Sequence, residues 1–177
     1  MKGLSELPEG AKVIIVSRNP LDACVSGYYH FAKGWDFEAW AAVWLSGYAY
    51  FGDFFEWVRG WHEDALHHPD KGLWLQYEDM QSDPRGQIVK IAAFLNIPVT
   101  EEIVDKVLKY SSFDSMKEQA NAKGGDQGGH LRQGKSGDWR NHFSDSMVQE
   151  FRAKYAAVLA GTGLVYSVGE GGVDFTA

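Results

Sequence analysis

Two segments that each predict a strand followed by a helix constrain the fold of this chain most strongly. In the first, the apolar, β-branched run of residues 13–16 leads through Ser-Arg-Asn into Pro20. Such a run is typical of a strand buried on both faces, and proline suits the first turn of a helix. In the second, residues 72–77 predict a strand, and Asp83-Pro84 predicts the start of a helix after an acidic turn, Glu78-Asp79. This order favours an α/β fold with a parallel sheet.

The rest of the chain is predicted to be mainly helical. We expect one or two helices over residues 35–62, with a break near Gly47 or Gly52, and interpret their many aromatic residues as core rather than as a cofactor site. Further helices are expected over residues 21–32, around 88–95, from Thr100, and over 147–159 with Ser144 as the cap. Residues 161–177 are rich in glycine and predict a loose tail. Two strands are too few for an independent parallel sheet, which indicates part of a larger one.

Composition excludes several classes of protein. The net charge of −7 argues against nonspecific binding to nucleic acid or anionic membranes, although a local cationic pocket remains compatible with it. The single cysteine, Cys24, forms no internal disulfide, which favours a reducing compartment. No Cys/His cluster has zinc-ligand spacing, and no apolar run approaches the roughly 18 residues that span a membrane. We therefore expect a cytoplasmic protein without a metal.

Two cationic segments predict a phosphate site. Arg18 follows the first strand, at the end of a parallel sheet where ligands bind, and its planar fork of donors matches phosphate oxygens. Ser26, eight residues later, could add a hydroxyl donor. A surface arginine with a structural serine explains that pair equally well. About a hundred residues further on, Arg132, Gly134 and Lys135 lie in a second candidate loop, whose glycine lets the backbone approach an anion.

Part of the second segment also fits a different motif. Residues 129–136 match the G-x-x-x-x-G-K-[ST] pattern of nucleoside-triphosphate P-loops. That motif requires a buried strand before it and a helix after it. The glycine-rich residues 121–128 are unsuited to a core strand, and Gly137-Asp138 interrupts an immediate helix. A P-loop phosphotransferase is therefore the third choice among the functions.

Four ordered segments resemble the cytosolic sulfotransferase family, which transfers sulfate from 3′-phosphoadenosine 5′-phosphosulfate. They are Arg18-Asn-Pro with Ser26, Tyr77-Glu-Asp, Ser111-Ser-Phe113 with Met116, and Arg132-Gln133-Gly134-x-x-Gly137-Asp-Trp139. The similarity runs from about residue 11 to 159. It implies an α/β fold with a partial three-layer parallel sheet of the P-loop-like sulfotransferase type. Residues 1–160 would be the carboxy-terminal part of one such domain, followed by the glycine-rich tail at 161–177.

The resemblance also implies a role for each residue. The first group would contact the donor's 3′-phosphate, from two segments: Arg18, Ser26, Arg132, Gln133 and Gly134. The second group would contact or line the adenine: Tyr77, Ser111, Phe113 and Met116. The family usually has lysine at the place of Gln133. An uncharged amide therefore replaces one positive charge that would face the phosphate.

The resemblance assigns no catalytic residue. The family's Lys-Ser-Gly-Thr loop for the 5′-phosphosulfate and its catalytic histidine have no match before Arg18. His30 is not the matching base, although it is a candidate for lining an acceptor pocket. The expected function is sulfuryl transfer to a hydroxyl or amine of a small molecule, with this chain binding the 3′-phosphoadenosine end. The isolated chain is expected to be inactive and to self-associate through an uncovered sheet. The alternative is a non-catalytic nucleotide-binding or interaction module derived from the same fold.

Overall fold

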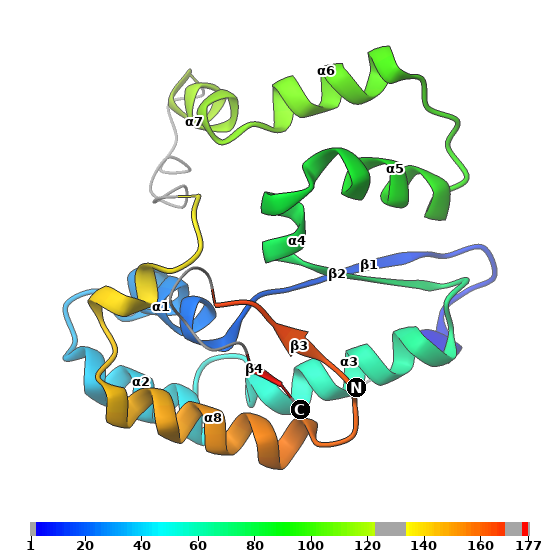
Figure 1. Ribbon diagram of the computed structural model, residues 1–177. Coiled ribbons are helices and arrows are strands. Elements are labelled where there is room, and N and C mark those ends of the chain that lie inside the picture. The colour runs from blue at the N-terminus through cyan, green and yellow to red at the C-terminus, as the bar shows by residue number, and fades with distance from the viewer. Residues whose placement is uncertain (1–2, 123–133, 169–174, 177) are drawn as a thin grey trace. The chain divides into compact units, whose positions relative to one another are not determined.

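The computed structural model describes residues 3–122, 134–168 and 175–176 (Figure 1). The chain forms two compact units. The first unit comprises residues up to Glu78 together with those from Ser136 onward, and the second comprises residues 79–135. The segments on either side of the second unit thus fold together.

The sheet of the first unit is a parallel pair of strands. β1 (Val13–Ser17) pairs with β2 (Gly72–Gln76), with Ser17 opposite Gln76. The predicted α/β class with a parallel sheet is therefore confirmed. The prediction that the first strand is buried on both faces is wrong, because Ile14 and Val16 are 38% and 45% exposed. Successive side chains of a strand point to opposite faces, and only the face with Ile15 and Ser17 is covered by the described residues.

The first unit contains four helices of ten or more residues besides this strand pair. They are α1 (Pro20–Phe31), α2 (Phe37–Ser46), α3 (Phe54–His67) and α8 (Asp145–Leu159). Each begins after a residue whose side chain accepts a hydrogen bond from a backbone N–H of the first turn, which is how a short polar residue starts a helix. These N-cap residues are Asn19, Asp36, Asp53 and Ser144. Gly47, with φ of +83°, ends α2, so residues 35–62 form two helices with a break at the expected place.

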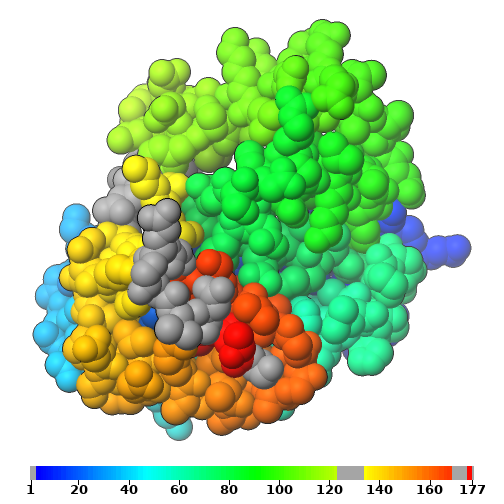
Figure 2. Space-filling view, in the orientation of Figure 1, coloured from blue at the N-terminus to red at the C-terminus, as the bar shows by residue number. Residues whose placement is uncertain are grey.

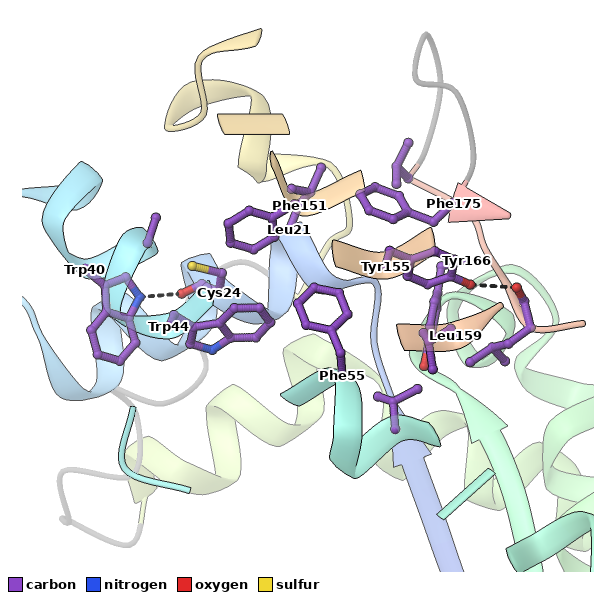
Figure 3. Close-up of a cluster of buried hydrophobic side chains, with 14 of the residues drawn as sticks. Leu21, Cys24, Trp40, Trp44, Phe55, Phe151, Tyr155, Leu159, Tyr166 and Phe175 are labelled. Carbon is purple, nitrogen blue, oxygen red and sulfur yellow. Dashed lines mark hydrogen bonds between the residues drawn. The ribbon is translucent and has the colours of Figure 1, made fainter. Parts of the chain in front are cut away.

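An aromatic core holds these helices together (Figure 3). The rings of Trp44 and Phe151 are stacked with their centroids 5.4 Å apart, and thus join α2 to α8. The indole N–H of Trp40 donates to the carbonyl of Cys24 at 3.0 Å, which joins α2 to α1. The interpretation of the aromatic residues as core is confirmed for these positions.

The glycine-rich end of the chain is not a loose tail where it is described. Its two short strands, β3 (Val165–Tyr166) and β4 (Phe175–Thr176), pair antiparallel. The residues of this segment that are buried in the core are Leu164, Tyr166, Val168 and Phe175. Figure 2 shows β4, in red, beside the orange surface of α8. The apolar residues between the glycines bury enough surface to fix the segment.

The second unit contains helices only, among the residues that the structure describes. α4 (Tyr77–Ser82) leads into α5 (Pro84–Phe94), α6 (Glu101–Ser111) and α7 (Phe113–Ala122). The predicted N-caps Asp83 and Thr100 are confirmed, since each side chain accepts a backbone N–H three residues on. The predicted acidic turn at Glu78-Asp79 is wrong, because α4 begins directly after β2. The described residues also contain two 3-10 turns, at Leu4–Glu6 and Asp138–Asn141.

Candidate functional site

Arg18 and Tyr77 meet at one end of the strand pair. Both residues follow the last pair of the register, so the parallel arrangement brings them to the same edge of the sheet. The guanidinium carbon of Arg18 lies 4.5 Å from the centroid of the Tyr77 ring, which is cation–π geometry. The stacking orients a cation at the edge where ligands of parallel sheets bind.

The turn after Arg18 is held by a buried carboxylate. Oε1 of Glu78 accepts hydrogen bonds from the backbone N–H of Asn19 at 3.0 Å and from its side-chain amide at 2.9 Å. Burial raises the pKa of the Glu78 carboxyl above its ordinary value, while the hydrogen bonds from Asn19 and the charge of Arg18 act in the opposite direction. Glu78 thus ties the end of β2 to the β1–α1 turn.

Ser26 lies exposed on α1, one residue before Gly27. Gly27 and Arg18 line the same cavity. The structure therefore places Ser26 beside a residue of the cavity that Arg18 borders. Its hydrogen bond to a phosphate remains a prediction.

Residues 136–139, called here the glycine segment, are bound to α1. Asp22 is 1% exposed, and its carboxylate accepts from the backbone N–H of Gly137 at 2.7 Å and from that of Trp139 at 3.1 Å. The two distant stretches of the sequence are therefore joined within the first unit, four residues after Arg18. Arg132 and Gln133 themselves lie outside the described residues.

Sequence reasoning missed Asp22. A signal was present, because Asn19-x-x-Asp22 has the spacing of a capping box at the start of a helix. The side chain of Asn19 does accept from the N–H of Asp22 at 2.9 Å. However, local spacing does not show that the Asp22 carboxylate also binds backbone more than a hundred residues away.

In the second unit, Gly134 packs against Phe113. Gly134 has φ of +63°, and a Cβ added to it would lie 2.2 Å from a ring carbon of Phe113. Two predicted site residues are thus in close contact, and only glycine fits there. Ser111 and Met116 lie nearby in sequence and line an open, largely apolar groove of about 490 Å³ between α6 and α7. Apolar walls suit a nucleobase, and the adenine contacts of these residues remain predictions.

A second cavity, of about 440 Å³, lies in the first unit. Its lining combines Arg18 with aromatic side chains, among them Phe31, Tyr50 and Phe51. The ring of Phe31 lies 5.2 Å from that of Tyr50 and 5.5 Å from that of Phe51. Its volume is in the range of small-molecule sites. The core interpretation of residues 35–62 missed this cavity, since periodicity does not separate aromatic residues that fill a core from those that line a space.

Other candidate sites receive no support from the described residues. Ser136 lies in a bend, and the 3-10 turn at Asp138–Asn141 follows it rather than an α-helix, which argues against a nucleoside-triphosphate P-loop. Residues 129–133 of that pattern lie outside the described residues. Within the described ranges, no three His, Cys, Asp or Glu residues form a group that could hold a metal ion. No described helix is long and apolar enough to cross a membrane.

The fold and the site together define an α/β protein with a cationic side chain, Arg18, at one edge of its parallel strands. The chain belongs to the sulfotransferase family, since the model of the sulfotransferase domain matches residues 5–163. It is 38% identical to rat (Rattus norvegicus) sulfotransferase 2A6 and 36% identical to the 3-alpha-hydroxysteroid sulfotransferase of Cavia porcellus, over 165 residues in each case. The matches cover 85% of this chain and 57% of each relative.

Solved structures agree with this assignment. A crystal structure of mouse sulfotransferase SULT7A1 complexed with PAP has a TM-score of 0.77 and 27% identity, covering 85% of this chain and 59% of the other. A structure of retinol dehydratase in complex with androsterone and the inactive cofactor PAP has a TM-score of 0.80 and 25% identity, covering 93% and 53%. The expected fold of the sulfotransferase type is therefore confirmed.

Proposed function

We propose that the protein containing this chain transfers a sulfuryl group from 3′-phosphoadenosine 5′-phosphosulfate to a hydroxyl or amine of a small molecule. This chain binds the 3′-phosphoadenosine end of the donor. The observation that carries the proposal is the attachment of the glycine segment to the Arg18 turn, through the hydrogen bonds that Asp22 accepts. The similarity to sulfotransferases solved with PAP supports it.

The phosphate end of this site would use fixed cations and backbone N–H donors. Arg18, held by Tyr77, offers several donors to a dianionic 3′-phosphate. Ser26, Arg132, Gln133 and Gly134 are its proposed partners. The adenine would be contacted by Tyr77, Ser111, Phe113 and Met116.

The acceptor would enter the aromatic cavity of the first unit. Arg18 lies in the lining of that cavity, so an apolar acceptor would approach the edge of the sheet where the donor is proposed to bind. Two solved structures of retinol dehydratase contain androsterone and retinol, both apolar alcohols. In the reaction, the acceptor oxygen bonds to sulfur as the bond from sulfur to the bridging phosphate oxygen breaks. Adenosine 3′,5′-bisphosphate leaves, and the acceptor's proton passes to a base that no residue of this chain is assigned to supply.

The proposal includes two further properties, the compartment of the protein and the self-association of this chain. The single cysteine, Cys24, is buried and suits a reducing compartment, so we place the protein in the cytoplasm. The exposed side chains of Ile14 and Val16 form an apolar face on a two-stranded sheet, which favours self-association of the chain.

Calorimetry with adenosine 3′,5′-bisphosphate tests the proposal. Replacing Arg18 by alanine should weaken binding by roughly 1.5–3 kcal/mol, the scale of a hydrogen bond to a charged group. Arg132→Ala should have an effect of the same size. The exposed Arg59, which pairs with Glu56 on α3, is the matched control, and Arg59→Ala should leave affinity unchanged. Unchanged affinity in both the Arg18 and the Arg132 variants contradicts the shared phosphate site.

A further inference from the structure

A continuous chain of buried polar groups runs from the end of β2 to the glycine segment. Glu78 accepts hydrogen bonds from the backbone N–H and from the side-chain amide of Asn19. The side-chain amide of Asn19 also donates to Oδ2 of Asp22 at 2.9 Å. Asp22 in turn accepts the backbone N–H groups of Gly137 and Trp139. All five residues belong to the first unit.

The bonding of Asp22 differs from that of an ordinary helix cap. A capping side chain accepts from the first turn of its own helix, as Asp36 does from the N–H of Ala39. Asp22 instead directs both oxygens at backbone 115 and 117 residues away, and it is buried. A buried carboxylate is costly unless donors surround it. Here three N–H donors do so, and this arrangement fits a carboxylate alone, because an amide would present N–H groups to one or more of these donors.

The other side of the segment is also anchored. The indole N–H of Trp139 donates to the carbonyl of Val168 at 3.1 Å. Gly137 has φ of +98°, a backbone conformation that residues with a side chain rarely adopt. The position of residues 137–139 is thus determined from two directions.

From these contacts we infer that Asp22 is a positioning residue of the 3′-phosphate site. It does not bind the phosphate; it holds the backbone of Gly137 and Trp139 beside the turn that carries Arg18. The inference rests on the proposed function. An anion near a bound phosphate would by itself disfavour binding, so the carboxylate contributes through the backbone that it fixes.

The first test is amide hydrogen exchange without nucleotide, measured residue by residue by NMR. Asp22→Asn preserves the shape of the side chain but replaces one acceptor oxygen by an amide group. We expect the amides of Gly137 and Trp139 to exchange at least about tenfold faster, since an amide hydrogen exchanges when its hydrogen bond opens. Asp36→Asn is the control and should leave both amides unchanged. Unchanged exchange in Asp22→Asn overturns the inference.

The second test separates positioning from general stability. Asp22→Asn should weaken binding of adenosine 3′,5′-bisphosphate at least about tenfold and leave binding of adenosine 5′-monophosphate within about twofold. An equal loss for both nucleotides shows a merely structural role and overturns the inference. If Asp22→Asn does not fold, the unmodified chain provides the test: the bisphosphate, and not the monophosphate, should slow exchange at Gly137 and Trp139. Equal slowing by both, or by neither, overturns the inference.

The same binding measurements distinguish a failure of the proposed function from a failure of the inference about Asp22. A chain that shows no binding of the bisphosphate contradicts the proposed function, and the inference fails with it. A chain that binds it, and loses affinity in Arg18→Ala but not in Asp22→Asn, contradicts the inference alone.

Discussion

At the scale of single residues, the contact between Gly134 and Phe113 combines two constraints. The positive φ of Gly134 disfavours any side chain, and the ring of Phe113 fills the place of a Cβ. Gly163 has nearly the same φ, +67°, but nothing lies within 4 Å of its Cβ position. A comparison of alanine substitutions at Gly134 and Gly163 therefore separates the free-energy cost of the backbone conformation from that of the clash with Phe113.

Gly134→Ala should destabilise the second unit more than Gly163→Ala destabilises the first. The backbone cost is about 1–2 kcal/mol in both variants, and the clash adds to it only at Gly134. Exchange rates of α7 amides and far-UV circular dichroism melting measure the effect. Equal effects in the two variants would show that the Phe113 ring moves aside without cost.

Glu78 gives a second prediction at this scale. Because burial raises its pKa above 4.5 in the folded chain, its favourable contribution is present below pH 4.5 and is lost as pH rises through the folded value. Glu78→Gln does not titrate, so its free energy of unfolding relative to that of the natural chain should improve between pH 4.5 and 8. Urea denaturation at several pH values measures this. Glu38→Gln, on an exposed side chain, is the control, and a relative stability of Glu78→Gln that falls with pH contradicts the prediction.

At the scale of elements, the end of the chain supports the strand that carries Arg18. The Tyr166 hydroxyl lies 2.6 Å from the Ser17 hydroxyl, and both are buried. The Tyr155 hydroxyl donates to the carbonyl of Leu164 at 2.6 Å. The segment after α8 is therefore part of the scaffold of the site.

Tyr166→Phe should lower the free energy of unfolding by about 1–3 kcal/mol, because it removes a buried hydrogen-bond partner of Ser17. Tryptophan fluorescence during urea denaturation suits this measurement, since all seven tryptophans belong to the first unit. Tyr48 is 89% exposed, and Tyr48→Phe should have no measurable effect. A loss as small as that of Tyr48→Phe would show that the end segment is dispensable.

The elements that the sequence predicted well are those with local causes. Strands β1 and β2, the caps at Asp83, Thr100 and Ser144, and the break after α2 follow from residues within a few positions. The errors have distant causes. The burial of Tyr166 depends on Ser17, which is 149 residues away, and the role of Asp22 depends on Gly137. Family resemblance supplied the prediction of a joint phosphate site, which periodicity and spacing alone did not decide.

At the scale of the whole molecule, the strand pair exposes an apolar face. We predict that the chain self-associates with rising concentration and that Ile14→Lys reduces this association, because it places a charge on that face. Val165, 44% exposed on β3, is the control position for the same substitution. Sedimentation velocity decides the question. A monomer at all concentrations, or equal effects of both substitutions, contradicts the prediction.

The central claim is that this chain recognises the 3′-phosphate of the sulfate donor. Competition binding against labelled adenosine 3′,5′-bisphosphate tests it most directly, with unlabelled adenosine 5′-monophosphate and ATP as competitors. A site with donors placed for a 3′-phosphate leaves them unpaired when that group is absent. We therefore expect the unlabelled bisphosphate to displace the label and the other two nucleotides to fail at the same concentrations. Displacement by ATP as effective as that by the bisphosphate would contradict the claim and favour a nucleoside-triphosphate site.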